Sequence, residues 1–295
     1  GALFAALADV GEHVGHRWRT MLWTTAWLMV AGVVGEAVSD SPFLVVVVVS
    51  TVFAAGCGFV GALGPRSALV GTVALVTLTI FAGIPEVSSG FIPNALLIGL
   101  GGLVQTLVTV VPPLLRDPGL IRKPQDLGPV LPRLREHLIS RDPFAQHAVR
   151  LAVAILAATA VALIWHTPHS YWIPMTVAWI LKPDRNGTVD KVIGRVAGTI
   201  IGLLVIAVAV DVLHMGHVGM LVSVAVGCML TLMFVWANYA LAVMGVTILV
   251  AALFAPAFAS SVGTTLWLRV IDTLIAGAIA LLASARWSRL ARSAR

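Results

Sequence analysis

The chain has 295 residues, of which 59% are hydrophobic and only 11% are charged. Soluble domains carry roughly 25% charged residues, so this composition excludes an ordinary soluble domain and indicates an integral membrane protein. Runs of about 20 apolar residues recur along the sequence, which predicts membrane-spanning helices rather than barrel strands of about 10 alternating residues. The net charge of +6 is explained by membrane topology, so we expect no nucleic-acid partner.

The expected helices follow the apolar segments in chain order. They cover residues 20–37, 43–63, 67–84, 91–115, 146–165, 170–182, 192–212, 218–235, 238–254 and 265–285. With the polar linker after residue 115 placed in the cytoplasm, all but one of the 19 Lys and Arg residues fall on the cytoplasmic side. The exception is Arg269. This bias sets the orientation of a multi-pass protein whose linker and C-terminus are cytoplasmic, and it leaves Trp172 at the outer membrane boundary.

The beginning of the chain resembles a later stretch. An apolar segment is followed by the same four residue types in the same order, Asp9, Gly11, Arg17 and Thr20 in one copy and Asp184, Gly187, Arg195 and Thr199 in the other. We therefore predict an all-α polytopic transmembrane bundle of about ten helices in two parallel repeats of the same orientation, with the first repeat incomplete at its N-terminus. The alternative is a ten-helix protein with a short amphipathic start.

This repeat sets the expected domain boundaries. The parts are a first transmembrane repeat at 1–115, a cytoplasmic linker at 116–145, a second six-helix repeat at 146–285 and a basic cytoplasmic tail at 286–295.

The helix expected at 170–182 is short, with roughly 13 residues where a span needs about 20, and Pro174 interrupts its backbone hydrogen bonding near the start. Short helices at matched repeat positions point to substrate sites in transporters. Tyr171, Trp172 and Trp179 are therefore candidates for stacking on an aromatic substrate. The alternative is ordinary anchoring of these side chains at the membrane interface.

A polar turn follows this helix. Asp184, Arg185 and Arg195 either orient the chain around a turn in which Asn186-Gly187 supplies a positive φ, or form an inner gate of ion pairs.

Three glycines at four-residue spacing come next. Gly194, Gly198 and Gly202 predict a helix face that packs closely against a neighbouring helix.

Arg269 and Asp272 lie inside the last apolar segment. An ionisable group costs about 2.5–3.5 kcal/mol at the centre of a membrane helix, and the spacing of the two residues places them on one helix face. We interpret Asp272 as a proton carrier whose protonation frees Arg269 to bind a substrate carboxylate. A static ion pair that fixes helix packing is the alternative.

Several ordered motifs resemble the fusaric acid resistance-like (FUSC) family of inner-membrane transporters, which includes aromatic acid exporters. They are Gly64-Pro65-Arg66-Ser67-Ala68, Pro168-His169-Ser170-Tyr171-Trp172-Ile173-Pro174, Lys182-Pro183-Asp184-Arg185-Asn186-Gly187-Thr188, Arg195-x-x-Gly198-Thr199-x-x-Gly202, Asn238-Tyr239-Ala240-Leu241-Ala242 and Arg269-x-x-Asp272-Thr273. The resemblance implies a bacterial inner-membrane protein that exports small aromatic or other weak organic acids, coupled to protons. We also expect a homo-oligomer in the lipid bilayer.

Two other functions stay open. A passive organic-anion channel would use Arg269 and the inner basic residues for selectivity, and a non-transporting protein would serve as a scaffold in a cell-envelope complex. The sequence carries no nucleotide-binding motif, catalytic triad or metal cluster, so we expect neither an enzyme nor a cofactor or metal.

Overall fold

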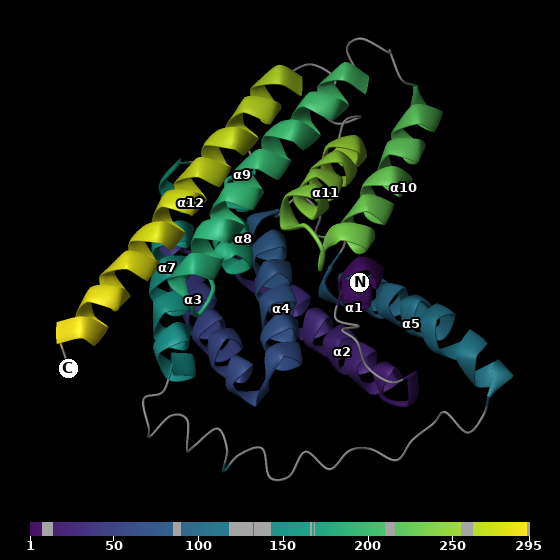
Figure 1. The fold of residues 1–295 in the computed structure, drawn as a ribbon, viewed down its shortest axis with the longest axis horizontal. Coiled ribbons are helices and arrows are strands. Elements are labelled where there is room, and N and C mark those ends of the chain that lie inside the picture. Colours follow the sequence, from purple (N-terminus) through teal and green to yellow (C-terminus); the bar gives the residue numbers. More distant parts are fainter. Residues whose placement is uncertain are drawn as a thin grey trace. The chain divides into compact units, whose positions relative to one another are not determined.

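The computed structural model describes residues 1–7, 14–84, 90–117, 132, 143–165, 167, 169–209, 216–254 and 262–293, and in these stretches the regular structure is helical (Figure 1). This agrees with the predicted all-α bundle. Most of the predicted linker, as well as Asp9 and Gly11, lies outside the described residues, as do the side chains of the basic tail. The chain forms two compact units, Gly1–Trp179 and Ile180–Arg295.

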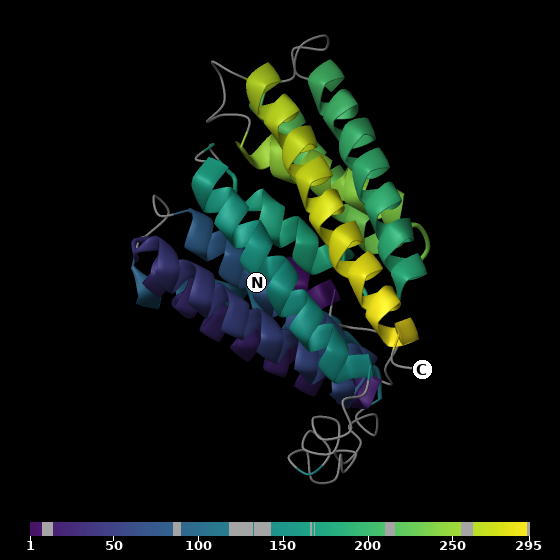
Figure 2. The same ribbon diagram turned by 90° about the vertical axis from the view of Figure 1, so that its left-hand side faces the viewer.

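The first unit contains the helices from the N-terminus to most of α8. They are α1 (Ala2–Leu7), α2 (Val14–Ser39), α3 (Phe43–Val60), the short 3-10 helix η1 (Gly61–Leu63), α4 (Pro65–Gly83), α5 (Phe91–Arg116), α7 (Pro143–Trp165) and α8 (Trp172–Ile180). Helix α2 packs against α4 and α5, and α3 packs against α4 and α7. Figure 2 shows the teal α7 lying along the blue-violet helices of this unit.

A turn of defined geometry separates η1 from α4. Gly64 has a φ of 125°, which only glycine adopts without strain, and Pro65 occupies the first turn of α4, where its missing N–H costs nothing. The first part of the Gly64-Pro65-Arg66 motif is therefore explained by the start of a helix.

The second unit contains four helices. They are α9 (Arg185–Ala207), α10 (His217–Phe234), α11 (Tyr239–Phe254) and α12 (Val262–Ser293). Helix α11 packs against both α9 and α10, and α12 packs against α9. Helices α9 and α12 run antiparallel, as Figure 1 shows.

Seven of the described helices are long and apolar enough to cross a membrane: α2, α3, α4, α5, α7, α10 and α12. Fewer helices meet these criteria than the ten crossings predicted from the apolar segments. The apolar run of α11 is shorter, and α8 has only 9 residues. Helix α9 has 23 residues but carries Asp190, Lys191 and Arg195 in its first half.

The two units share an order of packing. In the first, α2 contacts α4 and α5 while α3 contacts α4; in the second, α9 contacts α11 and α12 while α10 contacts α11. Helices α2, α3, α4 and α5 thus correspond to α9, α10, α11 and α12 in these contacts, as a parallel repeat would require. The repeat and its boundaries stay a prediction. The compact units divide inside α8 and not in the linker, because α7 packs on α3.

Candidate functional site

Two charged side chains are buried in α12. Asp272 is 0% and Arg269 3% exposed, and they lie one turn apart on the helix, as the sequence predicted. Neither carboxylate oxygen of Asp272 has a hydrogen-bond partner among the described residues. The nearby charge that acts on this carboxylate is the guanidinium of Arg269. When a buried carboxylate beside a cation gains or loses a proton, the charge that the cation faces changes.

Arg269 and Asp272 belong to a buried face of α12. Thr273, Ala276 and Ala280 share it, and each is at most 2% exposed. The Thr273 hydroxyl donates a hydrogen bond to the Arg269 carbonyl oxygen at 2.8 Å. It therefore does not donate to Asp272.

The facing helix α9 brings further polar groups to the same depth. A Cβ placed on Gly277 of α12 would lie 3.2 Å from Val192 Cγ1 of α9, which fixes the level at which the antiparallel helices touch. At a rise of about 1.5 Å per residue, Asp272 then lies between the levels of Arg195 and Thr199. Both follow Val192 on one face of α9 and are at most 3% exposed. The second unit therefore has a buried polar layer formed by Arg195, Thr199, Arg269, Asp272 and Thr273.

Arg195 connects this layer to α11. Its guanidinium interacts electrostatically with the phenol of Tyr239, the first residue of α11. Lys191, one turn before Arg195, places its Nζ 3.8 Å from the centroid of the same ring, a cation–π distance. Helices α9 and α11 thus meet around one set of basic and aromatic side chains.

The turn before α9 is a helix cap. Asp184 accepts a hydrogen bond from the Gly187 N–H at 2.5 Å, and the Thr188 hydroxyl donates to the Asp184 carbonyl at 2.9 Å and accepts from the Lys182 N–H at 3.1 Å. Helix α9 already begins at Arg185. The predicted positive φ at Asn186-Gly187 is therefore wrong. Glycine is needed there because a Cβ would lie 2.7 Å from Asp184 Oδ2.

The three predicted gate residues do not form one cluster. Asp184 and Arg185 are exposed at the start of α9, whereas Arg195 is buried. Along the helix axis about 16 Å separates Asp184 from Arg195, too far for a direct ion pair. One group in this turn has a shifted pKa. Burial, together with the nearby charge of Lys191, lowers the pKa of the Lys182 amine to about 8.

The glycine row on α9 packs as predicted, and its partner is α11. Cβ atoms on Gly194 and Gly202 would lie 3.0 Å from the Tyr239 ring and 2.8 Å from Thr247 Cβ, and one on Gly198 would overlap the Ala240 carbonyl. A second glycine contact was missed in the sequence. Gly227 of α10 meets Gly245 of α11 so closely that a Cβ on either would lie 2.7 Å from the other's carbonyl oxygen.

The aromatic candidates are packed inside the first unit. Tyr171 and Trp172 are 7% and 5% exposed, so both side chains are covered by protein, and the position of Trp172 at the outer membrane boundary stays a prediction. The His169 ring stacks on Trp172 at a centroid distance of 4.9 Å, and the Tyr171 ring lies 6.0 Å from Trp172, edge on. Trp179 is half-buried, 6.5 Å from the Phe4 ring. These rings already have aromatic partners, and stacking on a substrate would require them to move.

Two buried polar residues of the first unit also escaped the sequence interpretation. Glu36 of α2 is only 8% exposed. It accepts a hydrogen bond from Asn94 Nδ2 of α5 at 3.0 Å. Arg150 is buried within α7. Its NH2 nitrogen lies 3.1 Å from His147 Nδ1. The Glu36–Asn94 contact joins two helices, and spacing along one helix does not show which residue of another helix is its partner.

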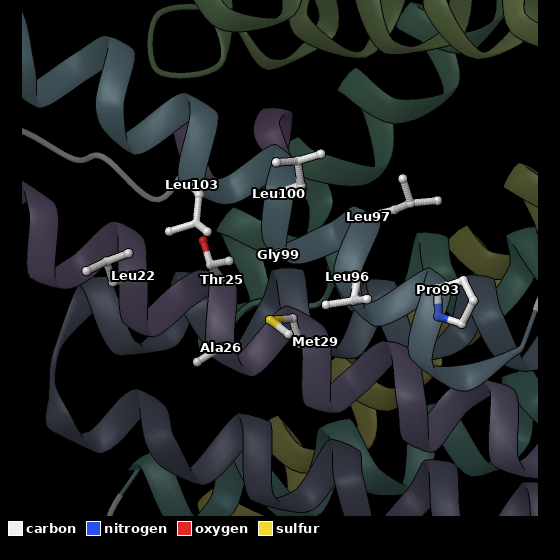
Figure 3. A pocket seen from close by; sticks show the side chains of 10 residues that line it. All are labelled: Leu22, Thr25, Ala26, Met29, Pro93, Leu96, Leu97, Gly99, Leu100 and Leu103. Carbon is white, nitrogen blue, oxygen red and sulfur yellow. The ribbon is translucent and has the colours of Figure 1, made fainter.

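A groove of about 730 Å³ runs between α2 and α5 (Figure 3). Its lining is almost wholly apolar: Leu22, Thr25, Ala26, Met29, Pro93, Leu96, Leu97, Gly99, Leu100 and Leu103. It has the character of a surface that faces hydrocarbon, and no charged side chain lines it.

Comparison with known proteins was informative for the second half of the chain. Residues 155–283 match the family model described as fusaric acid resistance protein-like. The chain is 32% identical over 162 residues to the inner membrane protein YccS of Escherichia coli, and 33% identical over 107 residues to the uncharacterized protein YhfK of the same organism. These matches cover 53% and 36% of this chain but only 22% and 15% of those proteins. No solved structure matches the chain.

Proposed function

We propose that this chain, whose residues 155–283 match the family model described as fusaric acid resistance protein-like, is a secondary transporter of the inner membrane that exports small aromatic or other weak organic acids together with protons. The observation that carries the proposal is the buried polar layer of the second unit, above all Asp272, whose carboxylate oxygens have no hydrogen-bond partner among the described residues. Ionisable groups inside membrane helices are costly and mark transport pathways.

The charges determine how proton and substrate are linked. With Asp272 ionised, it neutralises Arg269. When Asp272 takes a proton, an organic anion takes its place beside the guanidinium as a charge-assisted hydrogen-bond partner. Both states carry the same net charge at this pair, so each can move through a low-dielectric interior at similar cost. Proton and anion therefore bind together, and an acid formed in the cell leaves with its proton down its own gradient.

Other groups would have supporting roles. Arg195 lies at the level of Asp272 and supplies a second cation for the substrate carboxylate. In this proposal Tyr171, Trp172 and Trp179 contact an aromatic ring of the substrate only after rearrangement of their present packing. Asp184 and Arg185 orient the start of α9.

Proteoliposomes with an alkaline lumen test the proposal. The probe is radiolabelled benzenesulfonate, which stays ionised and so cannot cross lipid as a neutral acid. With the membrane voltage clamped by potassium and valinomycin, co-transport predicts uphill accumulation in the lumen, absent from protein-free liposomes. Accumulation in an acidic lumen would instead show exchange against protons and would contradict the charge linkage.

The channel and scaffold alternatives give different results in the same vesicles. A channel carries current that reverses at the equilibrium potential of the anion and accumulates nothing at zero voltage. Absence of both flux and current, with benzoate as well as benzenesulfonate, would overturn transport in favour of a scaffold.

A further inference from the structure

Helices α3 and α10 occupy equivalent positions in the two units. The equivalence is fixed by one glycine contact in each unit. Gly71 of α4 and Gly245 of α11 lie equally far from the first residues of their helices, Pro65 and Tyr239. A Cβ on Gly71 would lie 2.5 Å from the Cys57 carbonyl oxygen of α3, and one on Gly245 would lie 2.7 Å from the Gly227 carbonyl oxygen of α10.

Pairing Cys57 with Gly227 aligns the rest of the two helices. Three positions become identical: Val48 with Val218, Val52 with Val222, and Ala55 with Ala225. Gly58 of α3 pairs with Cys228 of α10, again two small residues.

The equivalent faces differ in what covers them. On α3, α7 packs at Gly58, where a Cβ would lie 2.8 Å from Ala148 Cα and 3.3 Å from Leu151 Cδ2. Thr51 and Ala55 share that side and are half-buried. On α10 the residues that match Thr51 and Ala55 are open: Leu221 is 70% exposed and Ala225 is exposed as well. Cys228, which matches Gly58, is half-buried, and Leu232, one turn further along the same face, is 39% exposed. Among the seven long apolar helices of the described chain, α10 is the least buried.

We infer that the face of α10 formed by Leu221, Ala225, Cys228 and Leu232 is the docking surface for one more membrane helix, which stands to α10 as α7 stands to α3. The four positions follow one another at i, i+4, i+7 and i+11, the spacing of a helix–helix seam. Small residues at Ala225 and Cys228 allow the close approach that Gly58 allows on α3. The occupant is an apolar helix of the same polypeptide. It has small residues where it touches α10, as α7 has Ala148 where it touches Gly58 of α3. In a parallel repeat equivalent helices have equivalent neighbours, so α10 should have a neighbour placed as α7 is on α3.

Spin labels in the full-length protein test whether the face is covered. After replacement of Cys57 and Cys228 by Ala, a single label is placed at Leu221 or Leu232 on the face. Val222 and Met233, 50% and 60% exposed, serve as lipid-facing controls and Ala148, 6% exposed, as the covered control. We expect oxygen collision rates at 221 and 232 several-fold below those at 222 and 233 and near that at 148. Equal rates at all four α10 positions would overturn the inference.

Photo-crosslinking identifies the occupant. Benzoylphenylalanine at position 221, with position 222 as the control, should yield an intramolecular crosslink at the mass of one chain, which peptide mapping assigns to an apolar helix. A crosslinked dimer would show a second copy on this face, and lipid adducts alone would show only bilayer; either result contradicts the inference. Size-exclusion profiles confirm folding, and Leu232 provides a second site if the Leu221 variant misfolds.

Discussion

Single buried ionisable groups divide into two kinds in this protein. Glu36 of α2 accepts a hydrogen bond from Asn94 of α5, so its carboxylate serves to join two helices. Asp272 receives no such bond from the described residues and is balanced by charge alone. A residue without fixed hydrogen bonds changes protonation with less rearrangement, which is why we assign the proton to Asp272 and not to Glu36.

Lys182 gives a prediction about pH. Its pKa is lowered from 10.5 to about 8 in the folded protein, so between these values the unfolded chain binds more protons and stability rises with pH. Below pH 8 the cost of the buried charge is fully present. We expect the Lys182→Met variant to unfold at a higher temperature than wild type at pH 7, and the advantage to shrink towards pH 10. A difference that does not depend on pH would show that burial does not perturb this amine. Thermal unfolding in detergent micelles measures both.

The cap of α9 gives a second prediction at this scale. Asp184→Ala removes the acceptor of the Gly187 N–H and should destabilise the second unit by about 1 kcal/mol, the usual cost of a lost N-cap. Asp184→Asn, which keeps an acceptor, is the matched control and should lose less. Transport by both variants should stay near wild type, because Asp184 is exposed. A transport defect in Asp184→Asn with normal stability would instead revive the inner gate.

At the scale of helices, α11 is held by glycine contacts on two sides. Gly198 and Gly202 of α9 lie on one side, and Gly227 of α10 on the other. Without a hydrophobic force between helices in lipid, close backbone approach of this kind supplies much of the association.

The contact between α10 and α11 can be tested by adding one methyl group. Gly245→Ala puts a Cβ 2.7 Å from the Gly227 carbonyl oxygen, so the helices must separate, and we expect a loss of thermal stability. The control is Gly56→Ala on α3, where a Cβ meets nothing within 4 Å and the substitution improves helix propensity by about 1 kcal/mol. A Gly245→Ala protein as stable as Gly56→Ala would contradict the close contact.

The sequence predicted helices well and partners poorly. Apolar runs gave the positions of α3, α4, α5, α10 and α11 to within a few residues, because length and hydropathy are local properties. The row of Gly194, Gly198 and Gly202 showed a close-packing face but not that α11 is its neighbour. Gly227 and Gly245 lie on different helices with no spacing to connect them, so their contact is visible only in the fold. The helix cap at Asp184 was not predicted, because the charged first turns of α9 were interpreted as a polar turn.

At the scale of the whole molecule, two units repeat one order of helix packing. The pair Arg269 and Asp272 was predicted from a single helix, and the fold adds Arg195 and Thr199 at the same depth. This polar layer lies within residues 155–283, the stretch that matches the family model, so the proposed coupling site belongs to that stretch. Whether it moves protons with organic acids is the central claim.

Counterflow and accumulation measured together in one variant test that claim most directly. Asp272→Asn keeps the size of the side chain but cannot carry the proton or its charge. It should still exchange labelled for unlabelled benzenesulfonate across the vesicle membrane, without dependence on pH, and should lose uphill accumulation driven by a pH gradient. Wild-type accumulation by Asp272→Asn, at wild-type pH dependence, would contradict the account.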